Sequence, residues 1–284
     1  MRRLYLLLLF FIFFSCVDKR ESGLPRLIIP EVKNVVSVNS QDMLNIYTFI
    51  PLACNFNKDE KVKELLIRCS ELKSKKIPFD TIIKKYDLKI IIDTSYVVSN
   101  NFFEYEFVPR PKDVIQDGLI NGKVPTELDE INSSKKINNY SSDVSKLMDK
   151  YVNCYPLLIF NNSNNETFLN SEFIQEAKDL DGKWKPIEFS FMYEMCGTGK
   201  DIQNILEAKK YFAFSIIKYQ GNFKTKIRVK LRNNNHIYYS NEIDGFINRS
   251  QFDQSFSDSF LESYGSNLNV ENYDYYKKRM FLEN

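Results

Sequence analysis

Histidine is almost absent from this sequence, which contains only His236 among 284 residues. A Ser-His-Asp or Cys-His catalytic centre would have to be built around that one residue, and a metal site made of several histidines is excluded. The surrounding pattern predicts that His236 lies at a hairpin loop, where a histidine needs no catalytic role. We therefore expect neither a bound metal nor a cofactor.

The sequence also lacks an excess of charge of either sign and is poor in glycine and proline. Its 39 Lys and Arg residues against 37 Asp and Glu give a net charge of +2, which provides no argument for a nucleic-acid partner. Nine Gly and nine Pro are too few for a low-complexity chain. A hydrophobic content of 43%, with 17 Tyr and 23 Phe, is sufficient for packed cores, so we expect a folded protein.

Closely spaced cysteine pairs are missing as well. Cys54, Cys69, Cys154 and Cys196 lie far apart along the chain, which argues against zinc and Cys-x-x-Cys redox sites. If the protein is exported and Cys16 is set aside, the remaining even number permits three disulfide pairings. Cys69 lies on the apolar face of a predicted helix, where a small buried side chain fits. We favour a Cys154–Cys196 disulfide, because both flank predicted strands of the same domain.

The N-terminus combines basic residues with a short apolar run. Arg2 and Arg3 precede an uninterrupted apolar stretch at 4–14. A helix of about 11 residues is roughly 17 Å long, whereas the hydrocarbon core of a bilayer measures about 30 Å, so this stretch is too short to span a membrane. A basic start, a short apolar middle and a small residue at the junction are typical of an export signal that is removed. We assign residues 1–15 to such a signal peptide.

The junction Phe13-Phe14-Ser15-Cys16 resembles the signal of bacterial lipoproteins, in which a lipid is attached to the Cys thiol and the chain is cut before that Cys. The resemblance implies that Cys16 becomes a lipidated N-terminus with at least two acyl chains, which is enough for stable anchoring. Polar residues 16–25 then form a tether. In such lipoproteins an Asp directly after the lipidated Cys commonly retains the protein in the inner membrane. Here Val17 occupies that position, which favours the outer membrane. The alternative is an ordinary secretory signal cut near Ser15.

Two domains are expected after the tether, because about 270 residues exceed what one compact core usually holds. Residues 26–111 predict an α+β domain, with strands at 26–38, 44–56, 88–98 and 102–108. A helix beginning at Asn57 carries a capping box with Glu60, and its apolar positions recur every three or four residues up to Leu72. Residues 112–150 are polar and predict a linker with a short helix capped by Asp143.

Residues 151–255 carry short strand signals separated by turns. Apolar or alternating runs occupy 155–160, 187–195, 211–219, 223–231 and 236–243, with an Asn-rich loop at 233–235 between the last two. This spacing predicts an all-β antiparallel sandwich. Residues 256–284 read as a polar and aromatic C-terminal tail.

Three segments of this region are similar to the later half of bacterial immunoglobulin-like domains. These segments are residues 206–211, then 221–228, where Gly221 precedes a basic strand, and 238–241, which reads Tyr-Tyr-Ser-Asn. The resemblance covers roughly residues 157–248 and implies an immunoglobulin-like sandwich that serves as a spacer or an adhesive module. Trp184 is expected in a loop or at a strand start, unlike the central core Trp of antibody domains, and the fold alone implies no chemistry.

One strand carries five cations at alternating positions, and these form a candidate face for an anionic ligand. Because side chains in a strand alternate between faces, all five should project the same way over about 27 Å. Anionic lipid headgroups, acidic glycans or an acidic patch of an envelope protein could bind there. The alternative is a solvated outer face balanced by Glu207, Glu242 and Asp244, on which lysines also prevent edge aggregation. The five residues are Lys224, Lys226, Arg228, Lys230 and Arg232.

Carboxylate pairs offer a second chemistry, but the pattern favours a simpler interpretation. Glu188 and Glu194 share one predicted strand face, and Glu104 and Glu106 share another, as side chains on solvated faces do. Residues 179–182 begin like a calcium loop, but the Gly comes two positions too early and no Glu closes the twelve-residue frame, so we expect a turn. No catalytic set emerges from these residues.

The sequence therefore predicts a non-catalytic envelope lipoprotein that is attached to the membrane through its lipid and acts as a spacer or binding module. One alternative is an envelope hydrolase or glycan-active enzyme that uses two carboxyl groups of the first domain. Another is an inhibitor or immunity-type lipoprotein that protects its own cell.

Overall fold

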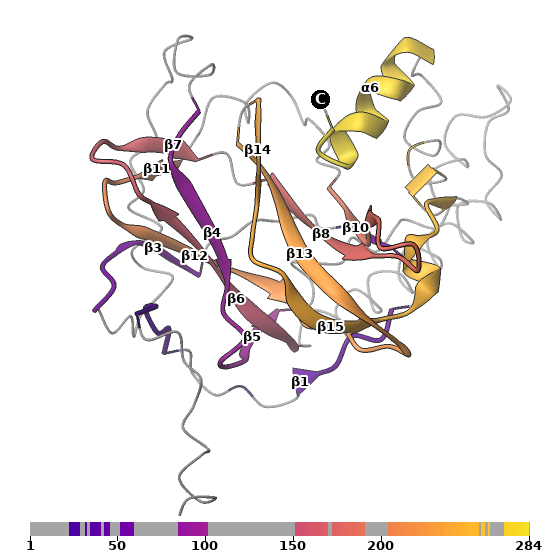
Figure 1. Ribbon diagram of the computed structural model, residues 1–284, viewed down its shortest axis with the longest axis horizontal. Coiled ribbons are helices and arrows are strands. Elements are labelled where there is room, and N and C mark those ends of the chain that lie inside the picture. The colour runs from indigo at the N-terminus through magenta and orange to yellow at the C-terminus, as the bar shows by residue number, and fades with distance from the viewer. Residues whose placement is uncertain are drawn as a thin grey trace, which may run out of the picture.

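The computed structural model describes a mostly β protein (Figure 1). The residues that it describes are 23–28, 32, 35–40, 43–45, 52–59, 85–101, 151–169, 172–190, 204–233, 235–255, 257–258, 261 and 270–283. Within these ranges, none of the helices has the length and apolar character needed to cross a bilayer.

The first sheet is built around one long central strand, β6 (Tyr151–Asn161). On one side β6 pairs with β12, and on the other it pairs first with β4 and then with β5, all antiparallel. β12 continues to β3, whereas β1 adds to β6 in parallel. The remaining strands are β1 (Val35–Val36), β3 (Ala53–Phe56), β4 (Leu88–Ile92), β5 (Val98–Asn101) and β12 (Tyr211–Ile217).

The second sheet is antiparallel throughout and is centred on β13 (Phe223–Asn233). One edge of β13 pairs with β8 (Glu172–Lys178), which in turn pairs with β9 (Trp184–Pro186). The other edge pairs with β15 (Ile243–Ile247) and then with β14 (His236–Tyr239). β13 and β14 therefore form the predicted hairpin, but the partner strand that was predicted at 236–243 ends at Tyr239, and Ile243 begins β15.

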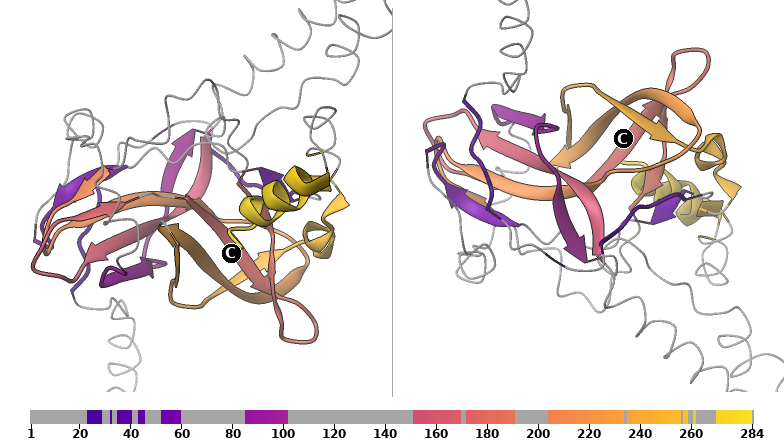
Figure 2. Two further views of the ribbon diagram at one scale, coloured as in Figure 1. Left: turned by 90° about the horizontal axis from the view of Figure 1, so that it is seen from above. Right: turned by 90° about the horizontal axis from the view of Figure 1, so that it is seen from below.

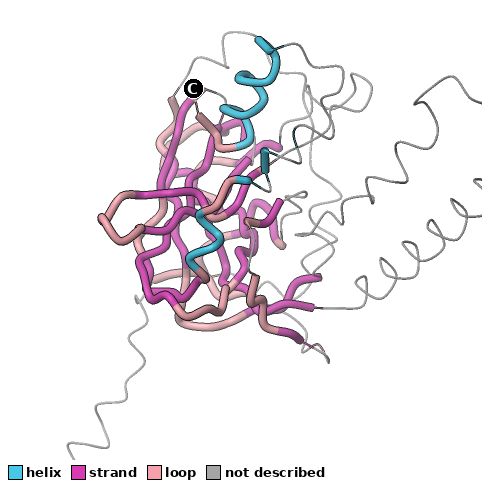
Figure 3. The backbone as a smooth tube through the Cα atoms, turned by 90° about the vertical axis from the view of Figure 1, so that its right-hand side faces the viewer, coloured by secondary structure: helices cyan, strands magenta, loops and turns pink. Residues whose placement is uncertain are grey.

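Short elements complete the described chain. β2 (Leu44–Asn45) pairs in parallel with β10 (Glu188–Phe189), and β7 (Thr167–Leu169) pairs antiparallel with β11 (Asn204–Leu206). A 3-10 helix, η3 (Arg249–Phe252), follows β15. The C-terminal helix α6 (Val270–Met280) lies at one end of the strands (Figure 3).

The two sheets curl around a shared apolar core, an arrangement consistent with a β-sandwich (Figure 2). The inward residues of β13 are Ile227, Val229 and Leu231, and the first sheet contributes Leu157 and Ile159 to the same cluster. The clean alternation of β13 explains this placement, because every second side chain of a strand points to one face.

Side chains also fasten the two sheets along one border. The amide of Asn241 accepts a hydrogen bond from Ile92 N at 2.7 Å and donates one to Ile92 O at 3.1 Å, so that it imitates a neighbouring strand at the edge of β4. Ser240 forms an isolated bridge with Ile90 in the same place. Tyr238 Oη reaches the backbone of Tyr86 as both donor and acceptor, at 3.0 Å in each case.

The strand pairing does not follow the predicted division into residues 26–111 and 151–255. β1, β3, β4 and β5 come from the first range, yet all four join a sheet whose centre is β6 and β12 of the second. The described parts of both ranges therefore share one sheet and one core. The helices predicted after Asn57 and Asp143 and the strand predicted at 102–108 lie outside the described residues.

The expected elements differ from the observed ones at the following places. The strand predicted at 88–98 is interrupted at residues 93–97, so β4 and β5 are separate. The interruption faces Pro156 of β6, a residue that has no N–H to donate to a neighbouring strand. Strand β8 and helix α6 were not predicted, and α6 forms part of the region interpreted as a polar tail.

Candidate functional site

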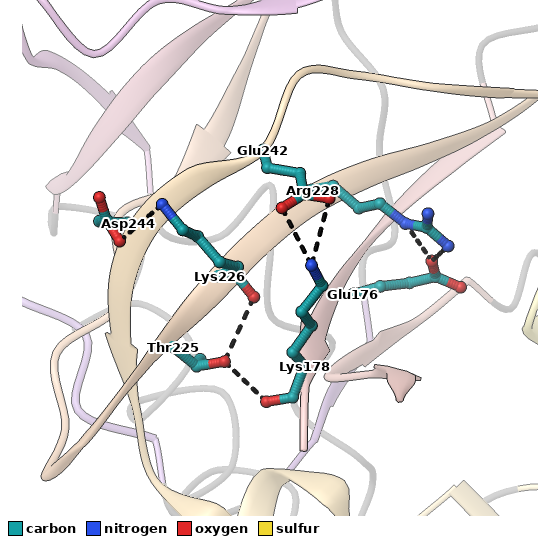
Figure 4. A network of polar contacts seen from close by, with 7 residues as sticks. All are labelled: Glu176, Lys178, Thr225, Lys226, Arg228, Glu242 and Asp244. Atoms are coloured by element: carbon teal, nitrogen blue, oxygen red, sulfur yellow. Dashed lines mark hydrogen bonds and ion pairs between the residues drawn. The ribbon is translucent and has the colours of Figure 1, made fainter. Parts of the chain in front are cut away.

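The five predicted cations lie on the outer side of β13, where intermediate or exposed residues alternate with buried ones from Arg232 back to Lys226. The same side of the sheet carries Glu176 and Lys178 of β8, as the register of β8 against β13 requires. We call this surface the mixed-charge face, and Figure 4 shows part of its polar contacts. Its members are Glu176, Lys178, Trp184, Lys226, Arg228, Lys230, Tyr239, Glu242 and Asp244.

Two ion pairs lie at the solvated part of this face. Lys226 Nζ is 2.9 Å from Asp244 Oδ1, and the two side chains are 45% and 64% exposed. The hydrogen bond and charge of Lys226 lower the pKa of Asp244. Lys178 Nζ is 3.1 Å from Glu242 Oε2 and 3.3 Å from Oε1. Exposed pairs of this kind contribute at most about 1 kcal/mol to stability, so these residues can exchange partners readily.

The third ion pair is shielded from water. Arg228 contacts Glu176 Oε2 through its Nη2 at 2.7 Å and its Nε at 2.9 Å, and the side chains are only 18% and 8% exposed. Lys230 Nζ lies 3.7 Å from the other oxygen of Glu176 and donates to the carbonyl oxygen of Phe281 at 2.8 Å. The charge of Glu176 is therefore compensated from two sides, and this group serves the packing of the sheet.

Aromatic rings flank the same arginine. The Arg228 guanidinium carbon lies 4.2 Å from the centroid of the Trp184 ring and 3.8 Å from that of Tyr239. Lys178 Nζ lies 4.8 Å from the Trp184 ring. Cation–π contacts at these distances hold the two rings and the guanidinium in place across β9, β13 and β14. Tyr239 nevertheless remains 47% exposed.

All five cations of the predicted strand thus lie on β13, and three of them, Lys226, Arg228 and Lys230, have an acidic partner. Among the acids expected to balance it, Asp244 pairs with Lys226, whereas Glu242 pairs with Lys178 of β8. Glu207 directly follows β11, away from the basic strand, and its backbone N–H donates to Asn55 Oδ1. Glu176 and Trp184 were missed as members of this face, and only the register of β8 against β13 could have identified Glu176.

The carboxyl group of Glu188 is buried at the point where the chain leaves β9 of the second sheet and enters β10. Glu188 is 2% exposed and accepts three hydrogen bonds of 2.7 Å, from Gln175 N, Gln175 Nε2 and Tyr219 Oη. Burial raises the pKa of Glu188 from 4.5 to about 7, although these bonds act in the opposite direction. The group therefore titrates near neutral pH.

The prediction that Glu188 lies on a solvated strand face is wrong. Pro186 still pairs with Glu176 in the second sheet, but two residues later Glu188 pairs with Leu44 of β2. The chain changes sheets between these residues, and the side chain of Glu188 turns inward. Because both carboxyl oxygens accept bonds from buried protein donors, Glu188 is not placed to act as a general acid on a substrate. Glu104, Glu106 and Glu194 lie outside the described residues.

The cysteines do not follow the predicted pairing. Cys154 is buried as a reduced thiol, with its Sγ 3.5 Å from the carbonyl oxygen of Val152. Cys54 is disulfide-bonded. The Cys154–Cys196 disulfide is therefore not formed. Cys16 and Cys196 themselves lie outside the described residues.

The segment that begins like a calcium loop forms a turn, as predicted. Asp179 Oδ1 accepts the N–H groups of Asp181 and Lys183, each at 2.9 Å, and Oδ2 lies 3.1 Å from Lys185 Nζ. Gly182 adopts φ +75° in this turn. Across the part of the chain that the structure describes, no three His, Cys, Asp or Glu side chains converge as metal ligands would.

Comparison with known proteins adds no relative from which a function could be transferred. No protein-family model, curated protein or solved structure matches this chain.

Proposed function

We propose that this chain is a non-catalytic, lipid-tethered protein of the bacterial cell envelope that binds a protein partner through the mixed-charge face. The tether is inferred from the basic start, the short apolar run and the lipoprotein-like junction at Cys16. Outer-membrane placement and an immunoglobulin-like character of the sandwich belong to the same proposal.

The observation that carries the binding role is the Trp184–Arg228–Tyr239 stack on the outer side of the second sheet, where Tyr239 is 47% exposed. Trp, Tyr and Arg are the residue types most often found at the energetic centre of protein interfaces. Here they are held by ion pairs and by the sheet, so a partner would meet a surface that is already ordered and loses little side-chain entropy on binding. The charged pairs around the stack provide a polar rim.

The same contacts favour a protein over a small anionic ligand. Lys178, Lys226 and Arg228 each already have a carboxylate partner. A phosphate or an anionic headgroup would have to displace those carboxylates, whereas a protein can offer acids and bases in a complementary pattern. An inhibitor or immunity-type lipoprotein is one form of such a module, because it too acts by binding a protein.

Site-specific photocrosslinking in intact cells tests this role. A photoreactive phenylalanine analogue replaces Phe246, whose strand position is paired with Lys224 on the same face. We expect one discrete protein adduct, and we expect Tyr239→Ser to reduce its yield about tenfold, as a loss of roughly 1.4 kcal/mol of binding energy requires. Tyr275→Ser, which changes an exposed tyrosine of α6, is the matched control and should leave the yield unchanged.

Two outcomes would contradict the proposal. An adduct that is insensitive to Tyr239→Ser would show that the stack does not contribute to binding. Salt-sensitive binding to vesicles of anionic phospholipid, lost on Lys224→Gln and Lys226→Gln without any protein adduct, would instead assign the face to an anionic surface. Absence of both signals would favour a spacer role.

A further inference from the structure

Residues 24–27, near the start of the described chain, are fastened to the first sheet. Leu27 N donates to Tyr96 Oη, in the turn between β4 and β5, at 3.0 Å. The Arg26 guanidinium carbon lies 5.4 Å from the centroid of the same ring. Leu27 is only 3% exposed, and Leu24 packs against the cluster that contains it. The folded body therefore holds the chain from Leu24 onward, at the end of the predicted tether.

Alternation along the strands shows which side of the first sheet this segment covers. Leu158 of β6 and Ala213 of β12 pack in one cluster with Leu27. Phe214, the next residue of β12, belongs instead to the core shared by the two sheets, and its ring centroid lies 5.5 Å from that of Phe173 in β8. Because successive side chains of a strand point to opposite faces, the segment lies on the face that is turned away from the second sheet.

The mixed-charge face lies on the opposite side of the sandwich. Val229 and Leu231 of β13 are buried in the shared core. Arg228 and Lys230 alternate with them and therefore point outward from the second sheet. The order through the molecule is thus the segment 24–27, the first sheet, the shared core, the second sheet and the mixed-charge face.

The tether is too short for the molecule to turn this face toward its own membrane. Eight steps along the chain lead from Cys16 to Leu24, and eight extended residues span at most about 29 Å. To place the mixed-charge face on the bilayer, the tether would have to pass round the margin of the first sheet and then past both sheets. With layers about 10 Å apart and strands about 5 Å apart, this route takes roughly 25 Å between backbones, and the outward side chains of β13 take up the rest.

We infer that the first sheet faces the membrane that holds the lipid, and that the mixed-charge face points away from it toward a protein partner in the aqueous space beyond. This inference rests on the proposed lipid tether and binding role, and it adds the place of the partner. A protein that projects into that space can reach Trp184 and Tyr239. The headgroups of the same bilayer, and a protein confined to it, lie on the wrong side of the molecule.

Energy transfer to labelled lipids tests this orientation on the full mature chain. The protein is purified with its own lipid and added to preformed vesicles whose outer headgroups carry an acceptor dye. A fluorescent amino acid replaces either Val97, which follows Tyr96 in the β4–β5 turn, or Phe246, on the same side as the mixed-charge face. These positions are 42% and 50% exposed. We expect transfer from position 97 to be at least about twofold stronger, because two layers of roughly 10 Å separate the two sides.

A longer tether provides the matched variant. Insertion of about 20 Gly and Ser residues after Arg20 raises the maximal reach to roughly 100 Å and leaves the folded body unchanged. The molecule can then turn over, so the difference in energy transfer between the two positions should become severalfold smaller.

Three outcomes would overturn the inference, and they differ in what else they affect. Equal transfer from both positions, or stronger transfer from position 246, on protein that floats with the vesicles contradicts the orientation and leaves the lipid tether intact. A difference that survives the longer tether shows that the tether does not set the orientation. Protein that does not float with the vesicles contradicts the tether itself, whereas the protein adduct at Phe246 in intact cells tests the binding role separately.

Discussion

Arg228 is the residue on which the mixed-charge face is built. Its guanidinium contacts Glu176 of β8 and lies between the rings of Trp184 and Tyr239. A planar guanidinium can make such in-plane hydrogen bonds and stack on rings at the same time, which a lysine ammonium cannot. Three neighbouring strands are thus fixed to β13 by one side chain.

Replacement of Arg228 should destabilise the protein far more than replacement of its neighbour Lys226. Arg228→Gln leaves the shielded Glu176 carboxylate with only Lys230 as a more distant cation, and we expect a loss of about 2–3 kcal/mol in the free energy of unfolding. Lys226→Gln breaks an exposed pair and should cost less than about 0.5 kcal/mol. Urea unfolding of both variants measures the difference, and equal losses would contradict this account.

At this scale the sequence predicts which side chains share a face but not which side chains pair across strands. The alternation from Lys224 to Arg232 is visible in the sequence because a strand has a period of two residues. The Arg228–Glu176 pair depends on the register between β13 and β8, which no local pattern specifies. The sequence predicts the wrong face for Glu188 because the chain changes sheets after Pro186. Once a strand pairs in a different sheet, the alternating positions that faced solvent can face the core.

At the scale of the elements, the side chain of Asn241, in the connection between β14 and β15, bonds to β4. It takes the place of the backbone hydrogen bonds that a neighbouring strand would make. The Asn241 amide satisfies both the N–H and the carbonyl group of Ile92. An unpaired sheet edge exposes backbone groups to aggregation, and this amide covers part of the β4 edge. The two sheets are therefore fixed to one another at this border.

Asn241→Ala should weaken this border measurably. It leaves the backbone N–H and carbonyl group of Ile92 without these bonds, and we expect a loss of about 1–3 kcal/mol in the free energy of unfolding, with faster amide exchange in β4. Asn162→Ala, which removes an exposed hydrogen bond to Asp87, is the matched control and should cost less than about 0.5 kcal/mol. A β4 that exchanges at the unaltered rate in Asn241→Ala would contradict the proposed fastening.

Elements with strong local preference were predicted, and those without it were not. β6, β12 and β13 are rich in β-branched and aromatic residues, so the sequence indicates strands there. β8 contains Gln175, Glu176, Ala177 and Lys178, which favour helices in isolation. Its strand conformation comes from pairing with β13 on one side and β9 on the other, a tertiary influence that propensity does not capture.

At the scale of the whole molecule, the first sheet is organised around β6, which pairs with strands that come before it and after it in the sequence. In the sequence, β4 and β5 are separated from β6 by residues 102–150, and β12 lies after β6. All three strands nevertheless pair with β6. Two domains were expected from chain length, but length cannot reveal that the centre of a sheet is shared between distant segments. Such pairing is long-range and leaves no local signature.

Separate expression of residues 26–111 and 151–284 tests this sharing. Because β4 and β5 lack a sheet without β6, and β6 lacks one whole side without them, neither fragment should fold alone. Mixing the two should restore a well-dispersed amide NMR spectrum. A dispersed spectrum from either fragment by itself would contradict the single shared sheet.

We propose that lipid on Cys16, the first residue of the mature chain, holds the molecule at a membrane surface, and intact-mass analysis of the N-terminal peptide tests this most directly. The protein is purified with detergent from the membranes of the cells that produce it, and Cys16→Ser is prepared in parallel. We predict a peptide that begins at Cys16 and carries at least two acyl chains, and release of the Cys16→Ser protein from the membrane fraction. An unmodified N-terminus on protein recovered from the soluble fraction would contradict the tether.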